Sequence, residues 1–278
     1  MFYILIFLLG LSVGSFLNVI ICRLGTKEPI IRSRSRCPKC GALLKWFDLI
    51  PLISFLIQKG KCRYCGKKIS WQYPLVELAT GLLFLFVVLK SPLATGGSYS
   101  IATGFFASLR MTMIMEPLFF LLVICFLLVI FVYDLKHYLI PDKIVYPAII
   151  ITLLNLGAKL LRIEELSSQI YTPLLAALLS SGFFLFLVLI SKGKWLGLGD
   201  VKLAGLMGLI LGWPNILLAL FLAFMSGAIV GITLIVAGKK TMKSQIPFGP
   251  FLAGATLVII IFGDIFSNLS LYLFSFLW

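Results

Sequence analysis

The stretch KWLGLGDVKLAGLMGLILGW, residues Lys194 to Trp213, is apolar enough to lie in a membrane, yet it contains Asp200 and Lys202 beside closely spaced glycines. Ionisable side chains are costly inside a bilayer, and those found there often mark functional sites. Two questions follow from this stretch: how the chain lies in the membrane, and what Asp200 does there.

The composition places the whole chain among membrane proteins. Of its 278 residues, 61% are hydrophobic and 12% are charged, and the mean hydropathy is +1.11. A run of about twenty apolar residues is long enough to cross a bilayer as a helix. We predict an all-α polytopic membrane protein with about eight transmembrane helices, at residues 1–21, 74–90, 116–133, 144–161, 173–191, 195–212, 215–237 and 247–277.

The positions of Lys and Arg predict the orientation of the chain. Most of the 24 basic residues fall in segments 22–73, 135–143, 191–194 and 238–246, which alternate correctly with eight spans. Basic loops near span ends are retained in the cytoplasm, so we place these segments there and both termini outside. The net charge of +14 is therefore mostly a topology signal, to which anionic membrane lipid adds as a partner. Nucleic acid is not predicted as a partner.

Two C-x-x-C pairs lie between the first two predicted spans, Cys37 with Cys40 and Cys62 with Cys65. Four thiolates in two such pairs, separated by 21 residues, suit a tetrahedral zinc ion. Disulfides are the alternative, but they seldom persist in the reducing cytoplasm. We expect a structural zinc in a small zinc-ribbon-like cytoplasmic domain, because four protein ligands leave no open position and so short a segment could scarcely fold without the metal.

Asp134 ends the third predicted span and Asp200 begins the sixth, so the topology places both at the cytoplasmic membrane face. If they meet, like-charge repulsion makes the pair share one proton. One carboxylate could then activate a water while the other hydrogen-bonds the carbonyl under attack, as in aspartic proteases. A simpler interpretation is that each is a charge at a span end, capping a helix or pairing with Lys202 or Lys136. The matched depth of the two favours the catalytic interpretation.

Two further elements could support an extended substrate. Gly197 and Gly199 carry no side chain, so a peptide could approach Asp200 closely where non-helical backbone lines a wet cavity. The prolines of Pro247–Pro250 interrupt a helix near the start of the last span and leave carbonyls free. This element is either a simple helix break or a wall of the substrate site, with Phe248 filling part of the pocket.

Together these elements resemble the type IV prepilin peptidases, the prepilin leader peptidase and N-methyltransferase family. Gly197-Leu198-Gly199-Asp200 matches the G-x-G-D signature of intramembrane-type aspartic peptidases. The resemblance covers nearly the whole chain in the order of the family. It is carried by GSFLNVIICRL at 14–24, CPKCG and KCRYCG at the cysteine pairs, WFDLIPLISFL at 46–56, YPLVE at 73–77, YDLKHYLIPD at 133–142, GLGDVKL at 197–203 and IPFGPFLA at 246–253.

The resemblance implies that Asp134 and Asp200 are the catalytic pair of an aspartic endopeptidase in the bacterial inner membrane. Such an enzyme cuts a short basic leader from prepilin or pseudopilin substrates on the cytoplasmic side. The resemblance also implies that the new amino terminus is methylated with S-adenosylmethionine. Gly60 corresponds to the family's glycine before the second cysteine pair, and Glu77 lies in the YPLVE element, so both are candidates for the methyl-transfer site. Glu77 could equally be an anion at a helix N-terminus.

These interpretations predict three parts of the chain. Residues 1–21 form the first transmembrane helix, 22–73 the cytoplasmic zinc-binding domain with the expected methyltransferase part, and 74–278 the transmembrane peptidase domain. The residues expected to support the substrate are Gly197, Gly199, Lys202, Pro247, Phe248 and Gly249.

A basic leader cannot be attracted by the basic loops of the enzyme, so we expect local acids such as Asp48 or Glu77 to meet it. The alternative function is an ion-coupled transporter, or a membrane receptor with a zinc-stabilised cytoplasmic docking loop. The sequence makes no prediction of the oligomeric state.

Overall fold

The computed structural model describes residues 1–26, 29, 34–91, 105–160, 168–194, 196–239, 241 and 246–275. Within these ranges it describes the backbone alone for residues 105–114, 160, 168–169 and 264–275. The ends of three predicted spans, at Leu161, at Trp195 and at residues 276–277, lie outside the described residues.

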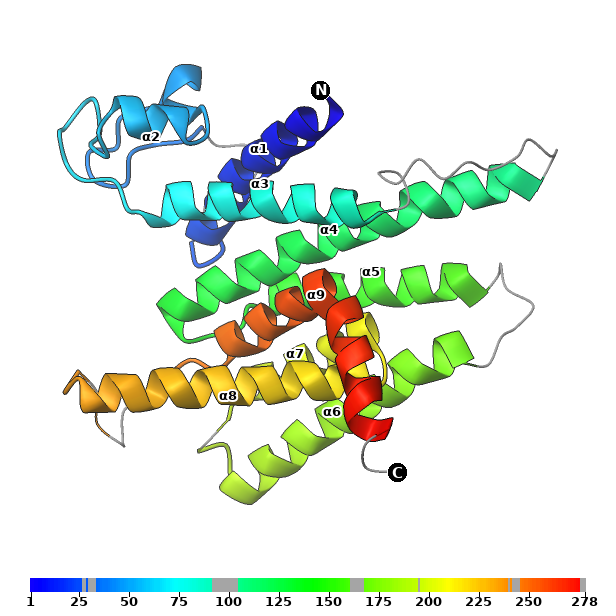
Figure 1. Cartoon of the computed structure of the whole chain (residues 1–278). Helices are drawn as coiled ribbons and strands as arrows, with labels where there is room; N and C mark the ends of the chain where they lie inside the picture. The colour runs from blue at the N-terminus through cyan, green and yellow to red at the C-terminus, as the bar shows by residue number, and fades with distance from the viewer. Residues whose placement is uncertain are drawn as a thin grey trace. The chain divides into compact units, whose positions relative to one another are not determined.

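The described part of the chain is helical, with no β-sheet strand (Figure 1). Each of the eight predicted apolar spans corresponds to one of its long helices. In chain order the elements are α1 (Phe2–Arg23), the 3-10 helix η1 (Trp46–Leu49), α2 (Ile53–Ile57), α3 (Gln72–Lys90), α4 (Phe105–His137), α5 (Asp142–Leu160), α6 (Ser168–Ser191), α7 (Leu198–Leu211), α8 (Asn215–Val236) and α9 (Gly249–Ser275).

Five helices among the described residues are long and apolar enough to cross a bilayer. They are α1, α3, α8 and the segments Met115–His137 of α4 and Ile170–Ser191 of α6. The predicted all-α membrane protein is therefore confirmed, whereas the count of eight crossings stays a prediction. Of the helices at the predicted spans, α7 is the shortest. Its 14 residues span about 21 Å, less than the ~30 Å thickness of a hydrocarbon core. It is short because Gly197, the residue before it, is extended, with φ −89° and ψ 158°.

The chain divides into two compact units, Met1–Val129 and Ile130–Trp278. In the first unit α1 and α3 pack closely and run antiparallel. A Cβ atom at Gly14 would lie 2.7 Å from the Cα atom of Glu77, so the small residue permits the close contact. Asn18 adds a polar tie, because its Nδ2 atom donates to the carbonyl oxygen of Tyr73 at 3.1 Å.

In the second unit, α7 packs against α5, α6, α8 and α9. Its contact with α6 is the tightest, since a Cβ atom at Gly208 would lie 2.4 Å from backbone atoms of Ala177. Ser180 on α6 donates a hydrogen bond to the carbonyl oxygen of Ala204 on α7 at 2.8 Å. Asp200 therefore lies on a helix that its neighbours hold on several sides.

Candidate active site and metal centre

The four cysteines form one cluster, as predicted. The sulfur atoms of Cys37, Cys40, Cys62 and Cys65 all lie within 4.8 Å of one another. Each pair sits on a tight turn, flanked by the isolated bridges Arg36 to Leu43 and Lys61 to Lys68. A tetrahedral zinc ion with Zn–S bonds of ~2.3 Å places its sulfurs about 3.8 Å apart. The four thiols therefore fit zinc.

The backbone around Cys37 prepares that thiol for metal binding. Burial of the thiol acts to raise its pKa, but hydrogen bonds from the backbone of Lys39 and Cys40, and from the thiols of Cys40 and Cys62, outweigh this. They lower the pKa of Cys37 to about 7. The thiolate is the form that binds a metal ion, so the turn favours the ligating state.

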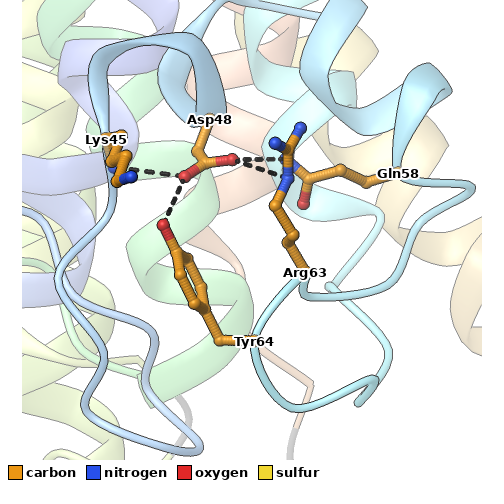
Figure 2. A network of polar contacts seen from close by, with 5 residues as sticks. All are labelled: Lys45, Asp48, Gln58, Arg63 and Tyr64. Atoms are coloured by element: carbon orange, nitrogen blue, oxygen red, sulfur yellow. Dashed lines mark hydrogen bonds and ion pairs between the residues drawn. The ribbon is translucent and has the colours of Figure 1, made fainter.

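Asp48 holds the segment between the cysteine pairs onto the second pair (Figure 2). Its side chain is 2% exposed and accepts hydrogen bonds from the backbone N–H of Lys45 at 3.1 Å, Nε2 of Gln58 at 3.1 Å and the hydroxyl of Tyr64 at 3.2 Å. The Nε atom of Arg63 lies 3.5 Å from its Oδ1 atom. Arg63 and Tyr64 lie between Cys62 and Cys65, so their contacts with this carboxylate stabilise the metal site. We call this set of contacts the Asp48 brace.

The sequence did not predict this role of Asp48 in the metal domain. The role bears on the expectation that Asp48 meets the basic leader. Asp48 is held by internal partners, which does not support its expected contact with a basic leader. Desolvation and the adjacent Asp48 carboxylate raise the pKa of Tyr64 above its ordinary value. The Tyr64 hydroxyl therefore remains protonated, and able to donate, over the physiological pH range.

The two methyl-transfer candidates have different surroundings. Glu77 on α3 is buried and accepts a hydrogen bond from the backbone N–H of Leu52 at 2.9 Å, which fixes the start of α2 to α3. Gly60 has φ +66°, and a Cβ atom there would approach the ring of Phe55 to 3.1 Å. Gly60 is thus a turn residue against an aromatic ring, and Glu77 is a buried acceptor between segments.

Gly60 lines a pocket of about 370 Å³. The other lining residues are Phe55, Leu56, Ile69 and Trp71, with the three lysines Lys59, Lys61 and Lys68. S-adenosylmethionine carries a sulfonium and an ammonium group against one carboxylate, so its net charge is positive. Three ammonium groups would repel it, and the pocket does not fit this cofactor on charge.

The structure brings the two predicted catalytic residues together in the second unit. Asp134 in the last turn of α4 is 4% exposed, Asp200 in the first turn of α7 is 9% exposed, and Asp134 interacts electrostatically with Asp200. Asp134 accepts a hydrogen bond from the backbone N–H of Gly249, the first residue of α9. Asp200 accepts one from the backbone N–H of Gly197 at 3.1 Å. Each carboxylate is thus held at the N-terminus of a helix, where the peptide dipoles favour a negative charge.

Lys202 pairs with a different aspartate from the one expected in the simpler interpretation. Its Nζ atom donates to Oδ1 of Asp142 at 2.7 Å and lies 4.9 Å from the ring centroid of Tyr146. These contacts tie α7 to the start of α5 and leave Asp200 without the lysine. Lys202 therefore positions α7, and its contact with a substrate stays a prediction.

Ile140 is a site residue that sequence reasoning did not single out. A Cβ atom at Gly199 would lie 3.0 Å from the Cβ atom of Ile140, and one at Gly249 would lie 3.1 Å from its Cδ1 atom. The isoleucine therefore packs against the two glycines next to the aspartates. Its only sequence signal is its place before Pro141, in the link between α4 and α5.

The proline element begins a helix and does not remain a free loop. Pro247 is half-buried, and Pro250 lies in the first turn of α9, where a missing N–H is tolerated. Phe248 packs among aromatic rings, with its ring centroid 6.1 Å from that of Phe184 and 5.1 Å from that of Phe224. Its predicted contact with substrate remains a prediction, because these rings account for its position.

Comparison with known proteins covers both halves of the chain. The model of the Bacterial Peptidase A24 N-terminal domain matches residues 8–91, and that of the Type IV leader peptidase family matches residues 121–232. The first range contains the cysteine cluster and the second contains both aspartates.

Curated relatives are similar to this chain over most of their length. The prepilin leader peptidase/N-methyltransferase of Myxococcus xanthus is 34% identical over 258 residues, which are 88% of this chain and 68% of that protein. The protein of the same name from Bacillus subtilis is 33% identical over 97% of both chains. That from Aeromonas hydrophila is 32% identical over 95% of this chain and 92% of its own. We found no significant match among solved structures. The chain belongs to the type IV leader peptidase family.

Proposed function

We propose that this chain removes the leader from prepilin-like proteins by aspartic-protease chemistry, with Asp134 and Asp200 as the catalytic pair. One observation carries the proposal: two buried carboxylates from distant parts of the chain interact, and each accepts a backbone N–H at the start of a helix. The names of the curated relatives supply the substrate class and the second activity, N-methylation of the new amino terminus. Family membership does not favour the transporter or receptor alternative.

The chemistry follows from the pairing of the two carboxylates. Two carboxylates in one buried site do not both ionise freely, so the pair holds one proton between them. The ionised member takes a proton from a water, whose oxygen attacks the scissile carbonyl carbon. The protonated member hydrogen-bonds the carbonyl oxygen, and a proton then passes to the leaving amine. The N–H groups of Gly249 and Gly197 keep the two acids oriented.

Other residues in the second unit support this arrangement. Asp142 and Lys202 hold α7 against α5, and Ile140 keeps Gly199 and Gly249 in place. Gly197 is exposed and extended, so a substrate strand can lie along its backbone without meeting a side chain. We retain Pro247 and Phe248 as candidates for further contacts with the substrate.

We assign a structural zinc ion to the four cysteines, in a domain of residues 22–73 that carries the methyltransferase part. Residues 74–278 form the peptidase part. S-adenosylmethionine, when bound, supplies the methyl group, and Glu77 is a better candidate than Gly60 for its environment because a buried acid suits a cation. The distribution of basic residues supports a cytoplasmic position for the zinc domain and the aspartates, in a protein of the bacterial inner membrane.

The test compares single carboxylate-to-amide changes in the full chain, reconstituted in liposomes with a purified prepilin. Asp134→Asn and Asp200→Asn keep the shape of each side chain but cannot share the proton, so each should lose cleavage by on the order of 10³-fold or more. Asp142→Asn is the matched control, since it makes the same chemical change at the first residue of α5, outside the pair. It should retain readily measurable cleavage. Zinc content is measured in each variant, and wild-type cleavage by either of the first two would overturn the proposal.

A further inference from the structure

The zinc domain presents large apolar side chains to its surroundings beside α3. Ile53, Leu56 and Ile57 are 54%, 71% and 69% exposed, and Trp71 is 69% exposed. The first three recur at the spacing that places them on one side of α2. Leu56 and Trp71 line the same pocket, so the apolar surface is continuous. We call these four residues the apolar face. A contiguous exposed surface of this kind marks an interaction site.

The covalent structure places the apolar face at the edge of a membrane. Trp71 directly precedes α3, one of the helices long and apolar enough to cross a bilayer. Tryptophan at the end of such a helix lies at the depth of the lipid headgroups. The hydrogen bond from Leu52 to Glu77 holds the start of α2 within about two turns of the end of the span. The apolar face is therefore tethered at both ends to the membrane surface from which α3 emerges.

The charged side chains that line the pocket of the apolar face are all positive. Its pocket is lined by Lys59, Lys61 and Lys68, and the lining contains no acidic residue. Lysine stems can lie along apolar surface while their ammonium groups remain at the level of the headgroups. The rings of Phe55 and Trp71, with centroids 5.1 Å apart, lie next to these charges. Aromatic rings beside lysines suit a ligand with an anionic head and an apolar tail.

We propose that the apolar face lies on the bilayer and that its pocket holds the headgroup of an anionic phospholipid. Lys59, Lys61 and Lys68 surround the phosphate, and Phe55 and Trp71 contact the glycerol and the first part of an acyl chain. S-adenosylmethionine and a basic leader peptide are both cationic, so the three lysines disfavour them. This site goes beyond leader cleavage and does not depend on it.

The experiment uses the full chain in nanodiscs of phosphatidylcholine, with or without phosphatidylglycerol. Two triple variants lose the same charge from the same domain: Lys59→Gln, Lys61→Gln and Lys68→Gln around the pocket, and Lys39→Gln, Lys45→Gln and Lys67→Gln outside it. Retained lipid is counted by native mass spectrometry after extraction, and hydrogen exchange is followed over residues 53–71. Zinc content shows that each variant has kept its domain.

The wild type and the triple variant outside the pocket should retain phosphatidylglycerol. In the anionic discs both should show protection of residues 53–71 from hydrogen exchange. The pocket variant should retain roughly tenfold less or lower, since each lysine near an anionic surface contributes about a factor of five. Equal retention by the two variants would overturn the proposal, as would equal protection of the wild type in the two kinds of disc. Protection by S-adenosylmethionine in phosphatidylcholine discs would assign the pocket to the cofactor and also overturn it.

Discussion

At Gly249 the backbone approaches the carboxylate of Asp134 so closely that a larger residue has no room. A Cβ atom there would lie 2.5 Å from Oδ2 and 3.2 Å from Cγ of Asp134. The N–H group of the same glycine donates to that carboxylate. A methyl group at position 249 must therefore displace Asp134 or break its hydrogen bond, and the packed surroundings leave little room for relaxation.

We therefore expect Gly249→Ala to lower the rate of prepilin cleavage about 10- to 100-fold, the equivalent of a hydrogen bond to a charged group. Helical content, measured by circular dichroism, should not change. Gly263→Ala, also on α9, is the control, because among the described side chains a Cβ atom there meets Cγ2 of Ile259 alone, at 3.7 Å, an ordinary contact. Wild-type cleavage by Gly249→Ala would show that the N–H of this residue does not hold Asp134.

Asp48 holds the segment between the two cysteine pairs onto the second pair. Asp48→Asn loses the ion pair with Arg63 and turns an amide group toward other donors, at a cost of about 1–3 kcal/mol. We expect zinc to pass to a chromogenic chelator about tenfold faster than from the wild type. Tyr64→Phe removes a single 3.2 Å hydrogen bond from the same carboxylate and should have a smaller effect. Unchanged zinc release from Asp48→Asn would mean that the brace does not stabilise the metal site.

At the scale of helices, α7 depends on its contact with α6. A Cβ atom at Gly208 would lie 2.4 Å from backbone atoms of Ala177, whereas one at Gly205 would lie 3.6 Å from Cβ of Ser181, an ordinary contact. Gly208→Ala should therefore destabilise the protein by about 1–3 kcal/mol and lower cleavage, since α7 carries Asp200. Gly205→Ala should be neutral or slightly stabilising, because alanine favours a helix. Thermal unfolding in detergent measures both, and equal midpoints would contradict the close packing.

The helices themselves could be predicted from the sequence, because an apolar run of sufficient length has few alternatives in a membrane protein. Their ends could not. Tyr138 ends α4 with φ +55°, and extended Gly197 delays the start of α7. Such turns depend on single residues and on local contacts, which carry no periodic signal.

Of the candidate site, too, one part could be predicted from the sequence and another part could not. The topology predicts a common membrane depth for Asp134 and Asp200, which stays a prediction, whereas the cysteine cluster predicted from the spacing is confirmed. The roles of Ile140 and Gly249 depend on contacts between segments that are far apart in the chain. No local pattern encodes a contact of that kind.

At the scale of the whole molecule, the two candidate centres belong to different compact units. The cysteine cluster lies in Met1–Val129, and both aspartates with their supporting glycines lie in Ile130–Trp278. Among the described residues, Asp134 accepts the N–H group of Gly249 in α9, and Asp200 accepts that of Gly197, the residue before α7. These two hydrogen bonds and the interaction between Asp134 and Asp200 all lie within the second unit.

This separation predicts that loss of zinc affects the two activities unequally. In a segment as small as residues 34–71, metal-binding free energy is folding free energy, so removing the metal should unfold that segment and abolish methylation. Cleavage should fall by no more than about threefold, a change below 1 kcal/mol in the barrier. Cys40→Ser removes a ligand, and Cys22→Ser removes a thiol outside the cluster as the matched control. Mass spectrometry of the product separates cleaved from cleaved and methylated prepilin. If Cys40→Ser loses both activities together while Cys22→Ser keeps both, the aspartates need the folded zinc domain, and the assignment of one activity to each unit is wrong.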